Sequence, residues 1–243
     1  MKAKFIFIFS FTLFSAEQLT AQDAHHYQTD FTKEEFARRR NTIFDAIGNK
    51  AVAVIQGASG LPGFSVFRQT NSFYYLTGIE TPHAYLLLNG RSRSATLYLP
   101  HRDEGMERNQ GKVLSAEDVD LVKQLTGIEQ VKGTEFLSND LVGTGLIRPP
   151  APKLYTEFSP AENGTDSRDE LLYAQARSAA DPWDGPTSRE ALFIQKIKER
   201  FPQFEINDLS PILDTMRLIK SEAEIKVIRK ATQIAGLGLM EAM

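Results

Sequence analysis

Four short apolar runs, each bounded by turn residues, constrain the fold more than any other feature of the sequence. They are AVAVI at 51–55, SFYYLTG at 72–78, AYLLLNG at 84–90 and ATLYLP at 95–100. The first is nearly continuous, as in a buried strand, and the others are rich in β-branched or aromatic residues. Because the connections between the last three runs hold only a few residues, neighbouring strands there must be antiparallel. The runs therefore predict a sheet that is at least partly antiparallel.

Helix start signals occur before, between and after these runs. The spacing of a capping box recurs at Thr32/Glu35, Ser115/Asp118, Ser167/Glu170, Thr187/Glu190 and Ser221/Glu224. Residues 137–143 predict a weak helix, and Ser210-Pro211 opens a short one. Two further strands are expected at 153–158 and 204–208. Strands mixed with helices predict an α/β fold in which a mixed β-sheet is flanked by helices.

Composition excludes several classes of protein. The chain has 243 residues, which suits one large domain or one domain plus part of another. It has no cysteine, so disulfides, zinc thiolate sites and cysteine nucleophiles are excluded. A formal net charge of −3 provides no basic field for nucleic acid. The run Arg38–Arg40 is interpreted as a solvated helix face.

The first residues have the pattern of a secretory signal peptide. Lys2 and Lys4 precede an apolar run at 5–14, which is too short to span a membrane, and Ala21 offers a small residue for cleavage. A buried N-terminal strand is the alternative. We expect a signal peptide at 1–21 and a product that is secreted or periplasmic, with no membrane attachment after cleavage.

One charged cluster is a candidate for chemistry. His101 lies close in sequence to Asp103, Glu104 and Glu107, and such side chains can hold a metal or move a proton. Consecutive residues leaving a strand point in different directions, however, so they do not converge. We interpret the segment as a salt-bridge loop of Arg102, Asp103 and Glu107. No catalytic residue and no metal ligand is predicted in this chain.

Three segments together resemble the Xaa-Pro aminopeptidase family, also called aminopeptidase P. They are FRQTNSFYYLTGIETPHAYLLL at 67–88, LPHRDEGMERNQG at 99–111 and LDTMRLIKSEAEIKVIRKA at 213–231. The second departs from the family pattern at Asn109, where the family usually has tryptophan. The three occur in the family's order, which makes the combination specific.

The resemblance implies a two-part enzyme. Residues 22–212 would form a creatinase-like N-terminal domain, and residues 213–243 the truncated start of a pita-bread (α+β) metallopeptidase domain. In the family that second domain holds two metal ions, usually manganese, through two Asp, one His and two Glu. These ligands lie further along, so none is assigned here and no cofactor is expected on this chain alone. The implied substrates are peptides with proline at the second position.

The resemblance assigns one substrate-binding candidate, Tyr74. It matches an aromatic position that is a tryptophan at the active-site mouth in some relatives, and a packed strand aromatic is the alternative. Arg68 and Gln69 match the motif and are interpreted as structural. The resemblance also implies a homo-oligomer. Two other hypotheses stay open: a non-enzymatic creatinase-like module for binding or dimerisation, and a prolidase or creatinase relative.

Overall fold

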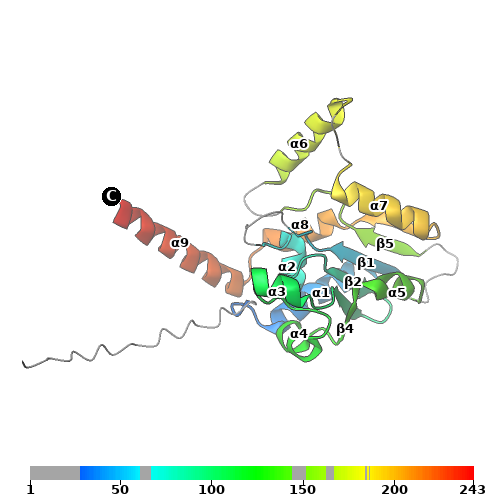
Figure 1. The fold of residues 1–243 in the computed structure, drawn as a ribbon, viewed down its shortest axis with the longest axis horizontal. Coiled ribbons are helices and arrows are strands. Elements are labelled where there is room, and N and C mark those ends of the chain that lie inside the picture. Colours follow the sequence, from blue (N-terminus) through cyan, green and yellow to red (C-terminus); the bar gives the residue numbers. More distant parts are fainter. Residues whose placement is uncertain (1–27, 61–66, 144–151, 163–166, 184, 186) are drawn as a thin grey trace, which may run out of the picture.

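A six-stranded mixed sheet is the centre of the computed structural model of the chain (Figure 1). The structure describes residues 28–60, 67–143, 152–162, 167–183, 185 and 187–243, so the predicted signal peptide at 1–21 lies outside the described residues. The strands are β1 (Ala51–Gln56), β2 (Tyr85–Asn89), β3 (Ser94–Leu99), β4 (Gln130–Gly133), β5 (Lys153–Thr156) and β6 (Glu205–Asp208). Their order in the sheet is β4-β3-β2-β1-β5-β6.

Strand β2 is antiparallel to both of its neighbours, and the other adjacent pairs are parallel. In register, Val54 lies opposite Leu87 of β2, and Leu87 lies opposite Thr96 of β3. On the other side of β1, Ala51 pairs with Lys153 of β5. The predicted mixed sheet is therefore confirmed, and the short connection between β2 and β3 joins an antiparallel pair as expected. Strands β1 and β2 are also antiparallel, although a long segment that includes α2 joins them.

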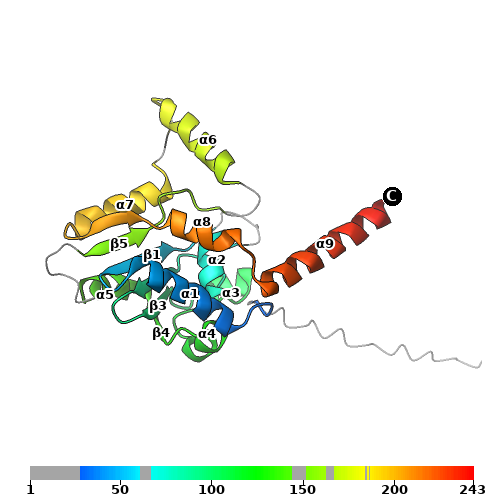
Figure 2. The ribbon, with the colours of Figure 1, turned by 180° about the vertical axis from the view of Figure 1, so that it is seen from behind.

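Helices cover both faces of the sheet (Figures 1 and 2). One face carries α1 (Lys33–Ile47), α2 (Asn71–Thr77), α4 (Val119–Thr126) and α8 (Ser210–Leu218). The opposite face carries α5 (Leu137–Gly143) and α7 (Arg189–Arg200). The remaining helices are α3 (Glu104–Gln110), α6 (Arg168–Ala180), α9 (Glu222–Ala242) and the 3₁₀ turn η1 (Thr134–Phe136). No helix in the described ranges combines the length and apolar character needed to cross a membrane.

The burial of strand β1 on both faces of the sheet explains why its apolar run is continuous. Ala51, Ala53 and Ile55 pack into the core on the α1 side, and Val52 and Val54 pack into the core on the α7 side. Successive side chains of a strand point to opposite faces, so a strand covered on both faces needs apolar residues at every position.

The run 72–78 forms helix α2, and its prediction as a strand was wrong. Phe73 and Leu76 are fully buried, and a spacing of three places them on one helix face. Gly78 ends the helix in the left-handed conformation, at φ 69°. A Cβ at Gly78 would meet the ring of Phe36 at 2.4 Å, so the helix end and α1 pack too closely for any other residue.

The predicted helix starts were mostly correct. Thr32 caps α1, and complete capping boxes form at Ser167 on α6 and at Ser221 on α9. Two starts are shifted. Ser188, one residue after the predicted Thr187, caps α7, and α4 begins after Asp118, whose carboxylate accepts hydrogen bonds from Ser115.

Arg39 and Arg40 of α1 are buried, so their prediction as part of a solvated face was wrong. Arg40 donates from Nη1 to the backbone oxygen of Leu76, 2.8 Å away, and from Nη2 to that of Thr126, 2.7 Å away. These carbonyls belong to the last turns of α2 and α4, where backbone oxygens lack helical partners. Burial lowers the pKa of Arg40 to about 10, so the guanidinium stays charged at neutral pH. One side chain thus satisfies the ends of two helices.

Helix α9 extends away from the sheet (Figures 1 and 2). None of its residues is buried, and Ile228, Ile234, Leu237 and Leu239 are each at least half exposed. Its first turn contacts the rest of the fold, where Glu224 lies 3.6 Å from Nη2 of Arg39.

Replacing Arg40 should destabilise the fold far more than replacing its exposed neighbour Arg38. Arg40→Met removes both donors and leaves two buried carbonyls without partners, so we expect a loss of about 2–4 kcal/mol in the free energy of unfolding. Arg38→Met removes an ion pair to Glu35 from a side chain that is 58% exposed, and should cost less than about 1 kcal/mol. Urea unfolding followed by circular dichroism measures both. Equal losses would contradict the role given to Arg40.

Candidate functional site

A depression of about 550 Å³ lies where α1 and α2 meet the junction of α8 with α9. It is lined by Phe31, Arg39, Arg68, Gln69, Asn71, Tyr74, Tyr75, Glu80, Arg217 and Glu224. The lining therefore includes all three residues that the sequence singled out in the 67–88 segment: Arg68, Gln69 and Tyr74.

Tyr74 lies on α2 and is partly exposed towards this depression. Burial, followed by the nearby carboxylate of Glu80, raises the pKa of Tyr74 to about 12. The phenol is therefore neutral at every physiological pH. Tyr74 offers the depression an aromatic face with one hydroxyl group, and it cannot act as a base there.

Arg68 and Gln69 have different roles. Arg68 is exposed at the rim and forms an ion pair with Glu80 at 3.2 Å. Gln69 is buried, its side-chain oxygen accepts hydrogen bonds from the backbone of Ala58 and Thr70, and its nitrogen donates to the backbone oxygen of Thr81 at 3.0 Å. Gln69 thus ties the segment before α2 to the segments that follow β1 and precede β2.

Arg39 lies in a cage of aromatic rings at the base of the depression. Its guanidinium carbon is 4.1 Å from the ring centre of Tyr75, 4.7 Å from that of Phe31 and 5.6 Å from that of Phe36. Nη1 donates to the backbone oxygen of Tyr75, and Nη2 lies 3.2 Å from the carboxylate of Glu35. A cation held over aromatic faces and paired to a carboxylate is a rigid contact, so it fixes α2 against α1.

A second polar network joins α2 to α8. Tyr75 donates through its hydroxyl to the backbone oxygen of Met216, at 3.3 Å. Glu162 accepts from Asn71 of α2 at 3.3 Å and from Arg217 of α8 at 2.9 Å. The segment after β5 therefore connects the start of α2 with the end of α8.

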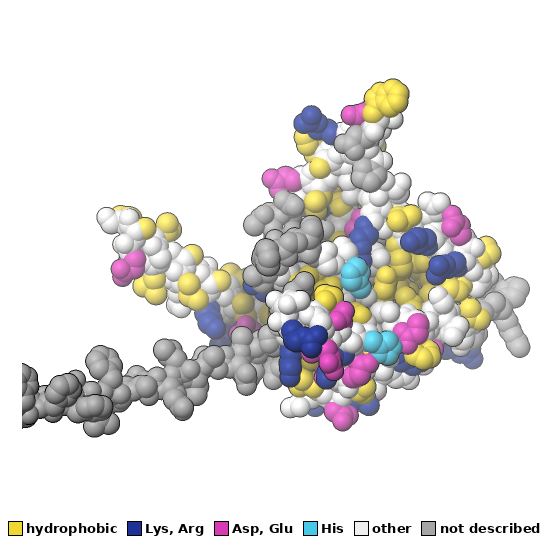
Figure 3. Space-filling view, viewed as in Figure 1, with side chains coloured by type: hydrophobic (Ala, Val, Ile, Leu, Met, Phe, Trp, Pro, Cys, Tyr) yellow, Lys and Arg dark blue, Asp and Glu magenta, His cyan; other side chains and the backbone are white. Residues whose placement is uncertain are grey.

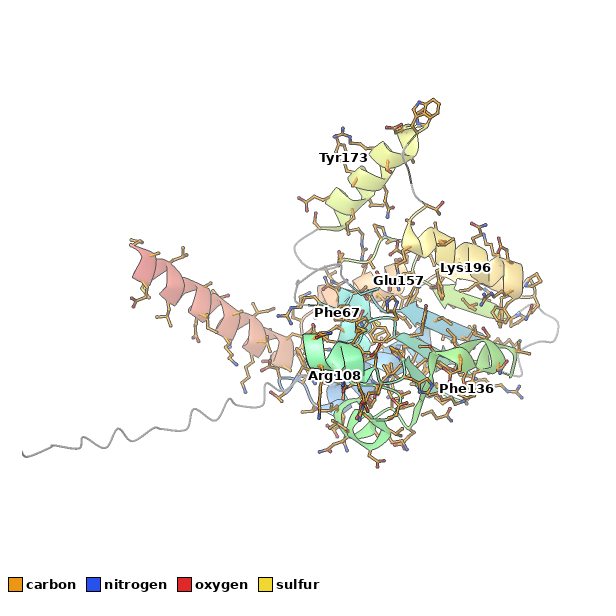
Figure 4. All side chains as sticks on the ribbon, in the orientation of Figure 1. Phe67, Arg108, Phe136, Glu157, Tyr173 and Lys196 are labelled. Atoms are coloured by element: carbon orange, nitrogen blue, oxygen red, sulfur yellow. The ribbon has the colours of Figure 1, made fainter. Side chains whose placement is uncertain are left out.

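Glu157 lies in the same region, between the sheet and the helices around it (Figure 4). Its carboxyl group accepts a hydrogen bond from the Ser72 hydroxyl at 2.7 Å. Burial raises the pKa of Glu157 to about 7, against the opposing effects of the Ser72 hydrogen bond and then of Arg168 and Arg217. The group consequently titrates within the physiological range.

His101 and its neighbours do not form a metal centre. The Nδ1 atom of His101 lies 2.5 Å from Glu117, and its Nε2 atom lies 3.0 Å from Glu135. The hydrogen bond to Glu117, followed by the one to Glu135, raises the pKa of His101. The hydrogen bond between His101 and Glu117 also lowers the pKa of Glu117 to about 2. The carboxylates occupy opposite ring nitrogens, so the three groups do not converge on one point. Within the described residues no group of three or more potential ligands could hold a metal ion.

The predicted salt-bridge loop is partly correct. Arg102 lies 3.7 Å from Glu107, as expected, but its shorter ion pair is with Asp118 at 2.6 Å. Asp103 instead accepts from the backbone nitrogens of Gly105 and Met106 as the N-cap of α3. The segment is a helix start rather than a loop, and the capping carboxylate was the signal that could have revealed it.

Comparison with known proteins identifies the domain. Residues 36–145 match the family model "Aminopeptidase P, N-terminal domain". The Xaa-Pro aminopeptidase of Haemophilus influenzae is 29% identical over 232 residues, which is 89% of this chain and 44% of that protein. Xaa-Pro aminopeptidase 3 of Dictyostelium discoideum is 29% identical over 180 residues, 73% of this chain and 29% of that protein. The chain thus spans less than half the length of these curated relatives.

Solved structures show the same fold. Aminopeptidase P from E. coli, solved with the inhibitor Pro-Leu, superposes with a TM-score of 0.57 at 21% identity. The match covers 85% of this chain and 43% of that one. The fold is that of an aminopeptidase P N-terminal domain. The family model, the two relatives and the fold together support the assignment of residues 36–145 to the N-terminal domain of the Xaa-Pro aminopeptidase family.

Because Tyr74 lines the depression, we expect that removal of its ring has only a small effect on the free energy of unfolding. Tyr74→Ala should cost about 1 kcal/mol of unfolding free energy, because the ring is partly exposed. The adjacent Phe73→Ala should cost about 3–5 kcal/mol, because that ring is fully buried. Urea unfolding of the two variants makes the comparison. If Tyr74→Ala costs as much as Phe73→Ala, the ring is a core residue and not a wall of the depression.

Glu157 should make the fold less stable as the pH rises. The folded state keeps the proton up to about pH 7, whereas the unfolded carboxyl loses it near 4.5. Raising the pH from 4.5 to 7 therefore favours unfolding, by at most about 3–4 kcal/mol, and the loss is constant above that range.

Glu157→Gln should remove this dependence and be more stable than the wild type at pH 8, with little difference at pH 4. Glu199→Gln is the control, since that side chain is exposed on α7 and should leave the pH profile unchanged. Urea unfolding between pH 4 and 8 measures all three proteins. A Glu157→Gln profile parallel to that of the wild type contradicts the assignment.

Proposed function

We propose that this chain is the N-terminal part of an exported Xaa-Pro aminopeptidase, in which it forms one wall of the substrate pocket. The whole enzyme would release the first residue from peptides whose second residue is proline. The match to two proteins named Xaa-Pro aminopeptidase supports the activity. Export rests on the predicted signal peptide at 1–21, and the homo-oligomer implied by the family resemblance belongs to the same proposal.

The observation that carries the proposal is the composition of the depression around Tyr74. One side comes from α1 and α2 of the domain that the family model matches, and the other side includes Arg217 of α8 and Glu224 of α9. Arg217 and Glu224 belong to the 213–231 segment, which resembles the start of the family's catalytic domain. A pocket wall at this junction faces the part of the enzyme that would carry the chemistry.

This chain contributes apolar contact with the substrate, and it excludes water from the pocket. The neutral ring of Tyr74 provides apolar surface for a proline-containing peptide, and Arg68 with Glu80 borders it. The two manganese ions proposed for the full-length enzyme do not fit the described residues, which contain no ligand group. No catalytic step is therefore assigned to a residue of this chain.

The exposed apolar side of α9 favours the presence of a further domain that covers this helix. Side chains such as Ile228 and Leu239, which are eleven residues apart and lie on the same side of the helix, would each gain about 1.5–3 kcal/mol on full burial. A catalytic domain that continues from α9 would bury this side. A second copy of the chain could bury it as well, and this corresponds to the alternative of a non-enzymatic dimerisation module.

The test begins with the gene sequence that follows the codon for Met243. We expect an open reading frame that encodes two Asp, one His and two Glu as metal ligands, and a full-length product that releases the first residue of an Xaa-Pro peptide in the presence of manganese. If no such frame follows, the dimerisation module is favoured instead.

Variants of that full-length product test whether Tyr74 forms part of the wall of the substrate pocket. Tyr74→Ala should raise KM or lower kcat about tenfold, because it removes apolar contact with the substrate and admits water. Tyr74→Phe should retain most activity, because the ring remains. Tyr173→Ala, on the exposed face of α6 and far from the depression, is the matched control (Figure 4). Unchanged kinetics in Tyr74→Ala would refute the role of the ring.

A further inference from the structure

A second concavity, of about 550 Å³, lies on the opposite face of the sheet between α5 and α7. We call it the α5–α7 groove. Its floor includes Tyr85 of β2 and Phe193 of α7, whose rings stack with centres 6.0 Å apart. Figure 3 shows this hollow as apolar surface with basic side chains along one border and a histidine at its edge. A volume in this range suits a small organic molecule.

One wall of the groove is basic. Arg189, Lys196 and Arg200 line it from α7, and spacings of seven and four residues place them on one side of that helix. Lys196 is labelled in Figure 4. Among the residues that the structure describes, none of the three forms an ion pair. The carboxylate on the facing side, Glu135, is engaged with His101 at 3.0 Å. The groove therefore presents three cations that have no ion-pair partner among the described residues, while the carboxylate of Glu190 acts on Arg189 from nearby.

Arg189 is the most informative of the three cations. It is partly withdrawn from solvent beside Tyr85, and burial lowers its pKa against the smaller opposing effects of Tyr85 and Glu190. Taking a cation out of water without a partner costs free energy, which an anion bound at this position would offset. The site thus has a partly desolvated guanidinium that donates no hydrogen bond to any residue in the described ranges, next to an aromatic surface.

His83 adds a strained backbone at the rim. It adopts φ 58°, a conformation that is unfavourable for a residue with a side chain. Its Nε2 atom accepts a hydrogen bond from the backbone nitrogen of Gly60 at 3.3 Å. Strain of this kind persists where the surrounding structure holds a side chain in one place, here at the edge of the groove.

The topology also points to this position. Gln56 at the end of β1 and Thr134 directly after β4 both line the groove, which therefore opens at the carboxyl ends of the parallel strands. After β4 the chain crosses to β5, on the other side of β1. Crevices at such a change of direction are the usual ligand sites of open α/β sheets.

We propose that the α5–α7 groove binds a small organic anion. Arg189, Lys196 and Arg200 hold its doubly charged group, a phosphate monoester or a dicarboxylate, and its apolar body packs on Phe193 and Tyr85. The proposal is independent of the peptidase function, because the groove and the depression around Tyr74 share no residue.

Calorimetric titration of the chain with phenyl phosphate tests the site. We expect saturable binding at one site with a dissociation constant below about 10 mM. Inorganic phosphate tests the contribution of the charge alone, and benzyl alcohol tests the contribution of the apolar body alone. Each should bind at least about fivefold more weakly than phenyl phosphate. No saturation by phenyl phosphate, or equal affinity for inorganic phosphate, would overturn the proposal.

A pair of variants locates the binding. Lys196→Gln should weaken phenyl phosphate about fivefold, because it removes one cation from the wall. Lys198→Gln removes the same charge from a residue of α7 outside the groove and should leave the affinity within about twofold. Both lysines are exposed, so both variants should fold. Equal weakening would show a diffuse charge effect and would also overturn the proposal.

Discussion

The buried guanidinium of Arg40 is the contact on which the arrangement of the helices depends. A helix ends with carbonyl oxygens that have no partner and carry partial negative charge, and burying two such ends side by side is unfavourable. Arg40 supplies donors to both ends at once, through the oxygens of Leu76 and Thr126. Helices α2 and α4 can therefore both end against α1, inside the protein.

The position of the site follows from this constraint. With the end of α2 fixed by Arg40, the preceding residue of α1, Arg39, contacts the ring and the backbone oxygen of Tyr75. Tyr74 is then directed to the depression, and Glu224 brings the first turn of α9 to the same guanidinium. Two successive arginines on one helix thus position both the candidate site and the start of the helix that leaves the domain.

Local signals in the sequence were sufficient for much of the fold. Strands β1, β2 and β3 and the capped starts of α1, α6 and α9 follow from patterns of a few neighbouring residues. Helix α2 was missed because aromatic residues favour strands, although the spacing of Phe73 and Leu76 and the stop at Gly78 match a helix. Strand β4 was also missed, since its four residues QVKG show no alternation and it forms by pairing with β3.

The parts that no local pattern could reveal depend on distant partners. The charge of Arg39 and Arg40 is visible in the sequence, but the carbonyls and rings that make their burial favourable come from α2 and α4. The family resemblance supplied Tyr74, and only the structure shows that Arg217 and Glu224 share its depression. The basic side of α7 becomes part of a groove only because α5, about fifty residues earlier, lies beside it.

The pairing of β1 has a consequence for synthesis of the chain on the ribosome. Strands β1, β2 and β3 are close in sequence and can pair early, whereas the other edge of β1 pairs with β5, which is translated about 100 residues later (Ala51 with Lys153). In the interval, the most apolar strand of the sheet has one open edge, which can pair with another nascent chain. A chaperone that covers this edge is therefore needed most while the ribosome has translated codon 100, just after the end of β3, but has not yet exposed residue 156, at the end of β5.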